Sequence, residues 1–237
     1  MPFSLPFAAR RGAGTALALL LVGLLLAACS SSKKPAASGS ATSRTPPGKA
    51  SAKPSPSSTA PPQANFSASG VKPVDAQDRS SANEAANAAA KQVINLMDTY
   101  YNDAFLQPAQ WGGGTFPSLS GLFTQDAAGS VAANLPVLTL GGLANQISRV
   151  DPTKQSAGEV SVLIEPDGSA SFATVTTRFE GTGKPSGGGP AVQILQSAQF
   201  MVQISGSTAQ IAGYDITSSY AGVAGSASYN GPIGATA

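Results

Sequence analysis

The sequence predicts an α+β domain in which one long helix packs on a curved antiparallel sheet of three to five strands. Two observations lead to this prediction. Apolar residues recur at helical spacing over residues 81–106. Apolar and polar residues then alternate in several segments between residues 160 and 216, which is typical of strands with one buried face.

The long helix is expected to begin at a capping box and to end before a proline. Ser81 is the expected N-cap, and Glu84 stands three residues later, where its side chain can bond back to the N-cap amide. Pro108 ends the helix, because a proline disfavours helical backbone in the residue before it. A shorter helical region is expected over residues 119–133, and Pro136 is expected to break it.

The strands are predicted from alternation and from turn residues. The expected strands cover residues 160–165, 169–180, 191–205 and 211–216, with residues 143–150 as a further candidate. Asp167 and Gly168 are typical of a tight hairpin turn between the first two. Residues 181–190 are rich in glycine and are expected to form a loop.

The clearest strand, over residues 191–205, has one apolar face and one polar face. Leu195 and Met201 are exceptions, because they fall on the polar face. In the strand that follows, the step from Ile211 to Tyr214 breaks the two-residue period. A β-bulge at Gly213 would restore it.

Composition excludes the commonest catalytic and metal sites. The chain has no histidine and one cysteine. Nucleophile systems that need histidine are therefore impossible, and the domain has no cysteine or histidine to bind zinc. The acidic residues are too scattered for a calcium site. We expect no enzyme activity, no metal, no cofactor and no nucleic-acid binding, since basic and aromatic residues are not interleaved.

Residues 30–73 resemble a linker in composition. They are mostly Ser, Ala, Pro, Lys and Thr, and they carry six basic residues, no acidic residue and one aromatic, Phe66. Such a segment buries too little apolar area to offset its ordering entropy, so it is predicted to be disordered. The lysines either attract the linker to anionic headgroups or only keep it soluble.

The N-terminus reads as an export signal. Arg10 and Arg11 precede an apolar run over residues 15–28, which is too short for a transmembrane helix of about 20 residues and fits a signal peptide. The run ends in Leu26, Ala27, Ala28 and Cys29, and this stretch resembles the lipobox of bacterial lipoproteins. The resemblance implies cleavage before Cys29 and attachment of palmitate-type acyl chains to it. The chain would then be anchored on the extracytoplasmic face of the bacterial cell membrane, exported by the Sec or the twin-arginine route.

These observations together divide the chain into four parts. We predict a signal peptide over residues 1–28, a lipid-anchored linker over 29–78, the α+β domain over 79–220, and a flexible tail over 221–237.

The order of elements resembles the cone-shaped nuclear-transport-factor-2-like fold, and in particular the mammalian-cell-entry-associated envelope proteins. The helix with Tyr100 and Tyr101, the strand end at Phe200 and Met201, and the closing segment 211–216 carry this resemblance. A cystatin-like sheet on a helix is the nearest competitor.

Two alternative functions are expected from these observations. The domain is a non-catalytic scaffold or accessory subunit that docks to a protein partner in a membrane complex. Alternatively, it is a carrier or sensor that binds a small apolar ligand between helix and sheet, with Tyr100, Tyr101, Phe179 and Phe200 lining the cavity. A carrier needs a closed apolar cavity of about 300 Å³ or more, whereas a scaffold predicts a filled interior and an apolar patch elsewhere.

Overall fold

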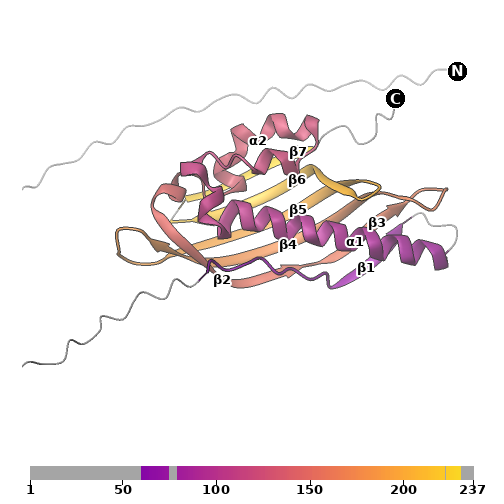
Figure 1. The fold of residues 1–237 in the computed structure, drawn as a ribbon, viewed down its shortest axis with the longest axis horizontal. Coiled ribbons are helices and arrows are strands. Elements are labelled where there is room, and N and C mark those ends of the chain that lie inside the picture. The colour runs from indigo at the N-terminus through magenta and orange to yellow at the C-terminus, as the bar shows by residue number, and fades with distance from the viewer. Residues whose placement is uncertain (1–59, 75–78, 222, 231–237) are drawn as a thin grey trace, which may run out of the picture. The chain divides into compact units, whose positions relative to one another are not determined.

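The computed structural model describes residues 60–74, 79–221 and 223–230 (Figure 1). The predicted signal peptide, Cys29, the linker up to residue 59 and the tail from residue 231 lie outside the described residues. In the described part of the chain, no helix is both long enough and apolar enough to cross a membrane.

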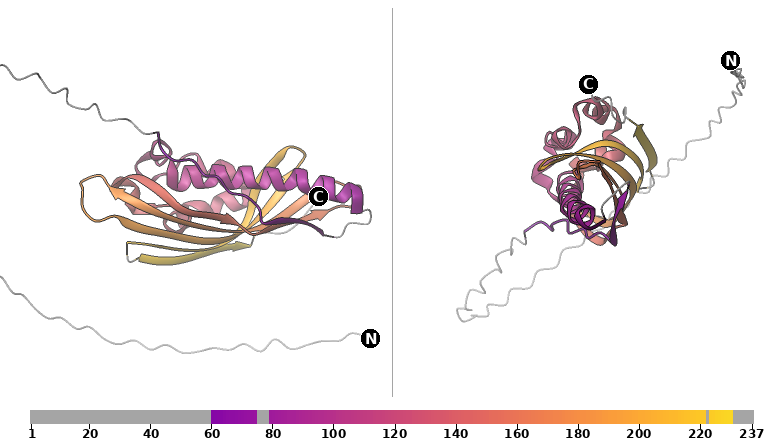
Figure 2. Two further views of the ribbon diagram at one scale, coloured as in Figure 1. Left: turned by 90° about the horizontal axis from the view of Figure 1, so that it is seen from below. Right: turned by 90° about the vertical axis from the view of Figure 1, so that its right-hand side faces the viewer.

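The α+β class is confirmed, because the described residues form two α-helices and one seven-stranded sheet. The strands are β1 (Gly70–Val74), β2 (Ile147–Ala157), β3 (Glu159–Ile164), β4 (Ala170–Pro185), β5 (Val192–Ser205), β6 (Thr208–Tyr220) and β7 (Val223–Asn230). The helices are α1 (Arg79–Tyr101) and α2 (Gln125–Leu138), joined by the short turns η1 (Asn102–Leu106), η2 (Pro108–Gln110), η3 (Gly112–Gly114) and η4 (Leu119–Leu122), with η5 (Gly141–Asn145) after α2. The strand order is β1-β3-β4-β5-β6-β7, and β2 also pairs with β4. The sheet curls around α1, which lies along its inner face (Figure 2).

Helix α1 is held on the sheet by a stripe of small and large apolar side chains. The buried residues of the stripe are Ala82, Ala86, Ala89, Ala90, Val93, Leu96, Met97, Tyr100 and Tyr101, at the spacing that places side chains on one helix face. Ser81 lies inside the first turn, since the helix already includes Arg79, so the predicted N-cap is wrong. The π-helical turn η1 continues the helix to Leu106, and Gln107 is extended ahead of Pro108, as that proline requires.

Helix α2 runs through the proline that was expected to end the second helical region. Thr124 is its N-cap, and the Thr124 hydroxyl oxygen accepts a hydrogen bond from the backbone N–H of Ala127 at 3.4 Å. Pro136 lies in the last turn, so the helix loses one backbone bond there and still continues to Leu138. The prediction of a break at Pro136 was therefore wrong.

The end of α2 is bound to the sheet through its free carbonyl groups. The last carbonyls of a helix have no partner within the helix. Here the Val137 carbonyl accepts from the Gln196 side-chain amide at 3.0 Å and from the Ser218 hydroxyl at 2.6 Å, and the Leu138 carbonyl accepts from the Tyr100 hydroxyl at 2.6 Å. These bonds explain why Gln196 and Ser218 are buried although they are polar.

The sheet has seven strands among the described residues where three to five were predicted, because two segments that were not predicted as strands add to it. Strand β1 comes from the predicted linker, and β7 comes from the predicted flexible tail. Strand β4 continues to Pro185 through the glycines of the predicted loop. Those glycines give close packing to β2: a Cβ on Gly183 would lie 2.6 Å from Ile147 Cδ1, and one on Gly181 would lie 2.9 Å from Val150 Cγ1.

Residues 60–69, which we call the strap, are packed on the domain and are not part of a free linker. The ring of Phe66 is buried and stacks on Tyr101, with ring centroids 4.6 Å apart. The backbone N–H of Ala64 donates to Asn102 Oδ1 at 2.8 Å, and that of Phe66 donates to Asp98 Oδ1 at 2.7 Å. The prediction that placed residues 29–78 in the linker is thus corrected for residues 60–74.

The predicted turn and bulge are confirmed. Gly168 has a φ of 84°, and its N–H donates to the carbonyl of Glu165 at 2.9 Å, which closes the β3–β4 hairpin. Between β5 and β6 the pairing shifts after Met201, so that Ala212 is the extra residue of the bulge. Gly213 is required there, because a Cβ would lie 2.9 Å from the backbone carbonyl oxygen of Tyr229.

Candidate functional site

The four residues predicted to line a ligand cavity do lie together, between α1 and the sheet. Tyr100 lies 5.1 Å from Phe200 and 5.0 Å from Tyr101, and Tyr101 lies 5.3 Å from Phe179, measured between ring centroids. All four side chains are 0% exposed. The helix brings in the two tyrosines, and inward-facing positions of β4 and β5 bring in the phenylalanines.

Two further rings complete this aromatic cluster. Phe105 lies 5.1 Å from Phe179 and 5.7 Å from Tyr101, and Phe66 of the strap stacks on the same Tyr101 ring. Rings at these separations are in contact, and each covers the surface of the next. The aromatic cluster therefore fills the space between the C-terminal end of α1 and the sheet with its own side chains.

The hydroxyl groups of the cluster are bound within the protein. The Tyr100 hydroxyl donates to the Leu138 carbonyl, and the Tyr101 hydroxyl shares a 2.8 Å hydrogen bond with Thr177 Oγ1. Burial raises the pKa of both phenols, so both stay neutral at physiological pH. The two tyrosine hydroxyls therefore form structural hydrogen bonds, and neither is ionised.

Asp98, three residues before Tyr101 on α1, takes no part in the Tyr101 hydrogen bond. One oxygen of the Asp98 carboxylate accepts the N–H of Phe66, and the Tyr101 hydroxyl is directed to Thr177 instead. Partial burial raises the pKa of Asp98, although the Phe66 hydrogen bond opposes that shift. The carboxylate therefore binds the backbone of the strap. Its negative charge is partly buried, and this desolvation of the charge lowers the stability of the folded protein.

This desolvation predicts a pH effect for Asp98→Asn. A raised pKa in the folded state means that the folded protein binds the proton more tightly, so the wild type loses stability as pH rises through the two pKa values. The asparagine oxygen still accepts from Phe66, so the variant is expected to melt at a higher temperature than wild type at pH 7. The difference should shrink as the pH falls towards about 3, where the wild-type carboxyl is protonated. Melting curves across this range, with Glu159→Gln as an exposed control, test the effect. A lower melting temperature for the variant at pH 7 would contradict it.

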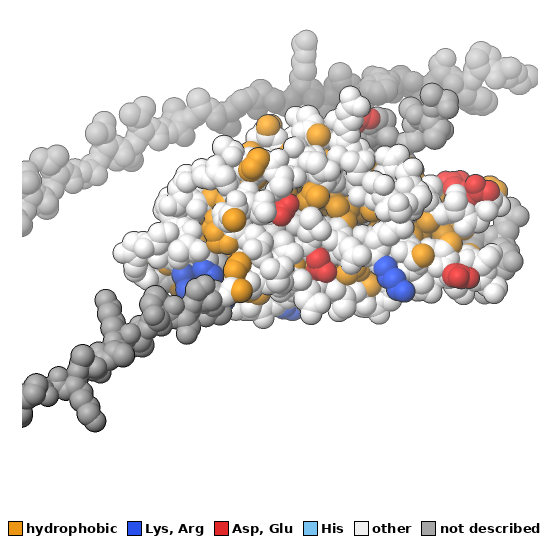
Figure 3. Space-filling model, viewed as in Figure 1, with side chains coloured by type: hydrophobic (Ala, Val, Ile, Leu, Met, Phe, Trp, Pro, Cys, Tyr) orange, Lys and Arg blue, Asp and Glu red, His pale blue; other side chains and the backbone are white. Residues whose placement is uncertain are grey.

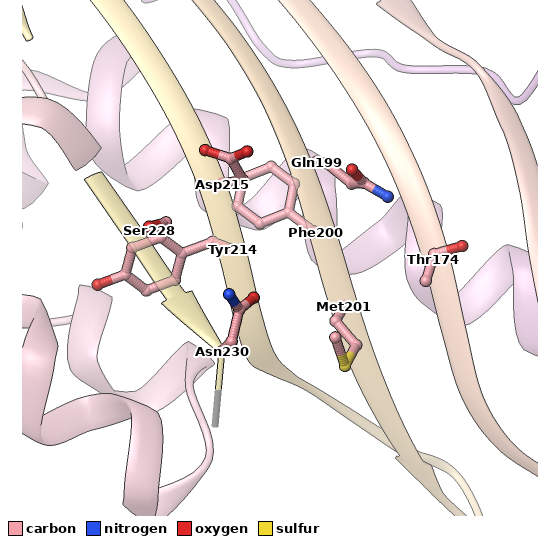
Figure 4. Close-up of a pocket in the computed structure, with 8 residues that line it drawn as sticks. All are labelled: Thr174, Gln199, Phe200, Met201, Tyr214, Asp215, Ser228 and Asn230. Carbon is pink, nitrogen blue, oxygen red and sulfur yellow. The ribbon is translucent and has the colours of Figure 1, made fainter. Parts of the chain in front are cut away.

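A second candidate site is a groove on the outer face of the sheet, the face opposite α1. One part is an apolar depression of about 290 Å³, lined by Val74, Ser161, Leu163, Phe172, Ala173, Thr174 and Met201. The other is a polar depression of about 230 Å³, lined by Thr174, Gln199, Phe200, Met201, Tyr214, Asp215, Ser228 and Asn230 (Figure 4). The two share Thr174 and Met201, so we treat them as one outer groove.

The alternation of side chains along β5 explains why the groove lies outside. The Phe200 ring contacts Tyr100 of α1, so its neighbours Gln199 and Met201 point to the opposite face. Gly213 of β6 pairs with Met201 of β5, and as a glycine it adds no side chain to that face. The bulge that requires this glycine thus leaves a depression beside Met201.

The sequence carries one signal for this groove, since Met201 and Leu195 are apolar exceptions on the polar face of β5. The structure separates them: Met201 is half-buried in the groove, whereas Leu195 is 39% exposed and is not among the lining residues. Leu163 and Phe172, also half-buried, could be assigned only once the β3–β4 register was known.

The groove has one charged lining residue, the exposed Asp215. On the other face of the domain, which carries α1, charged side chains stand in small, separate groups (Figure 3). Among the described residues, no group of three or more acidic, histidine or cysteine side chains is placed to hold a metal ion. The outer groove is therefore suited to an apolar group beside a cation.

No protein-family model matches the chain, and neither the curated proteins nor the solved structures include a significant match.

Proposed function

We propose that this protein is a bacterial envelope lipoprotein whose domain acts as a non-catalytic scaffold or accessory subunit of a membrane complex. One observation carries the choice of scaffold: the aromatic cluster fills the place where the ligand cavity was predicted, while an apolar depression lies open on the outer face. A scaffold needs a solvent-facing surface on which a partner can bury apolar side chains. The half-buried Leu163, Phe172 and Met201 supply that surface.

The lipid anchor is proposed from the sequence around Cys29. The resemblance of Leu26, Ala27, Ala28 and Cys29 to a lipobox, after a stretch typical of a signal peptide, implies that acyl chains are attached at Cys29, the start of the mature chain. The strap is in place by residue 60, so at most about 30 residues separate Cys29 from the domain, fewer than in the predicted linker over residues 29–78. A flexible chain of that length spans roughly 30 Å on average.

We also propose that the domain has the cone-shaped nuclear-transport-factor-2-like arrangement. A sheet that curls around one helix supports this proposal (Figure 2). The parallel pairing of β1 with β3 and the strap are additions to the element order on which the resemblance rests.

The carrier is the less favoured function. It would require the rings of Tyr100, Tyr101, Phe179 and Phe200 to separate around a ligand, although each is now covered by its neighbours. Native mass spectrometry of the purified full chain distinguishes the two functions. A retained small apolar molecule would favour the carrier, and a mass equal to that of the lipidated chain would favour the scaffold.

The anchor is tested by Cys29→Ser. We expect the variant to lose all incorporation of labelled palmitate, because no other thiol exists in the chain, and to accumulate as a precursor or leave the membrane fraction. Ser30→Ala is the matched control and should be labelled like wild type. Unchanged labelling of Cys29→Ser would overturn the lipoprotein assignment.

A further inference from the structure

We propose that the outer groove binds an extended segment of a protein partner in which an apolar side chain is followed, about three or four residues later, by Lys or Arg. The inference rests on the proposed scaffold function and deepens it, since it names the surface and the chemistry of the partner.

The apolar end is built from three strands. Leu163 of β3 pairs with Phe172 of β4, and Thr174 of β4 pairs with Met201 of β5. The three apolar side chains, Leu163, Phe172 and Met201, are half-buried around the depression, so each keeps surface that an incoming side chain can cover. Burial of a leucine-sized side chain in such a depression is the main source of affinity that the groove can offer.

The polar end of the groove can bind a cationic side chain. Asp215 is exposed, and it is flanked by Gln199 on β5 and Ser228 on β7, which are its register partners. Figure 4 shows these side chains on neighbouring strands around the depression. A carboxylate beside neutral amide and hydroxyl groups attracts Lys or Arg and repels acidic groups.

Charged residues at the two ends of the groove determine in which direction the partner's segment binds. Lys72 lies on β1 and pairs with Ser161 of β3, which lines the apolar depression three strands away from Asp215. A basic residue of the partner is thus repelled at the β1 end and attracted at the β6 end. The partner's apolar residue lies between them.

The spacing follows from strand geometry. Adjacent strands are about 4.8 Å apart, and residues rise about 3.3 Å along a strand. From the register, Asp215 lies roughly 8 Å from Met201 and roughly 16 Å from Phe172, so an apolar side chain seated between these two residues lies about 12 Å from Asp215. An extended peptide covers that distance in three or four residues. Because it crosses the strands obliquely, it is held by side chains and not by addition to a sheet edge.

The same chemistry argues against a lipid surface as the occupant. Anionic headgroups would meet Asp215, and the apolar residues are recessed in a groove instead of standing out from the face. A protein segment can enter the depression with one side chain and reach Asp215 with another.

The test uses the two methionines of the domain as reporters. The full chain in lipid nanodiscs is labelled with ¹³C at the methionine methyl groups. Met201 lies in the groove, and Met97 is fully buried in the core and serves as the internal control. The probes are serine-rich heptapeptides with one leucine, followed by lysine two to five residues later, and the same peptides with glutamate in place of lysine.

We expect the lysine peptides to shift the Met201 signal saturably and to leave Met97 unchanged, with the tightest binding at a separation of three or four residues. The glutamate peptides should bind at least about tenfold more weakly. Asp215→Asn should remove most of that difference, and Asp215→Lys should reverse it. Leu163→Ser should abolish the shift, whereas Leu195→Ser, the exposed leucine of the same face, should keep it. An unchanged Met97 signal shows that each variant is folded.

Equal binding of the lysine and glutamate peptides, no Met201 shift with any peptide, or full binding by Leu163→Ser would overturn the proposal. A Met201 shift with anionic vesicles instead of peptides would also overturn it in favour of a lipid surface. The scaffold function is tested separately by co-purification of a partner with the lipidated chain. If a partner is retained by wild type and equally by Leu163→Ser, the scaffold stands and the outer groove is not its docking site.

Discussion

Replacing Tyr101 with alanine is expected to lower the free energy of unfolding by about 3–5 kcal/mol, the cost of removing a large buried aromatic side chain. Tyr101 is 0% exposed, and it contacts four other rings: Phe66, Tyr100, Phe105 and Phe179. The rings around it come from the strap, from α1 and η1, and from β4, so the cavity cannot close by the shift of one element. Urea denaturation followed by circular dichroism measures the loss.

Two companion variants separate the ring of Tyr101 from its hydroxyl. Tyr101→Phe keeps the packing and leaves Thr177 Oγ1 without its partner, which predicts a smaller loss of about 1–3 kcal/mol. Thr99→Ala, on the exposed side of α1, should change stability little, because its hydroxyl bonds only to the Asn95 carbonyl of the same helix. A Tyr101→Ala protein as stable as Thr99→Ala would show that the aromatic cluster is not the centre of the core.

Replacing Phe66 with alanine should cost about 3 kcal/mol, although the residue lies in what composition predicts to be a linker. Its side chain is 3% exposed and stacks on Tyr101, and its backbone N–H is bound by Asp98. The loss of the ring would uncover one face of the aromatic cluster to water. Ser67→Ala, at an exposed position of the same strap, is the matched control.

A double-mutant cycle makes the Phe66 prediction specific. If Phe66 and Tyr101 act through their mutual stacking, the loss in the double variant should differ from the sum of the single losses by about 0.5–1.5 kcal/mol. Additive losses would contradict direct coupling. A Phe66→Ala protein as stable as wild type would mean that the strap is not part of the folded domain.

The parts of the fold that could be read from the sequence are the ones with local causes. Helical spacing over residues 81–106 corresponds to α1 and η1, and Pro108 limits them through its own ring. The β3–β4 turn at Gly168 follows from the positive φ that glycine allows. Such features need no knowledge of distant partners.

The elements that were missed depend on partners far along the chain. The strap has the composition of a linker, but Asn102 and Asp98, more than thirty residues away, accept its backbone N–H groups. Strand β7 is a run of small residues whose order comes from pairing with β6. The glycines of β4 resemble a loop until β2 is seen to pack against them.

The sequence by itself determined the α+β class, the inward side of α1 and the candidate aromatic residues. Periodicity and turn chemistry are properties of neighbouring residues, so these features could be read directly. Only the tertiary structure decided that the four aromatic residues pack against one another instead of lining a cavity, and that Leu163, Phe172, Met201 and Asp215 share one outer groove. Whether rings enclose a cavity or occupy it depends on the distance between helix and sheet, which is set by packing across the whole domain.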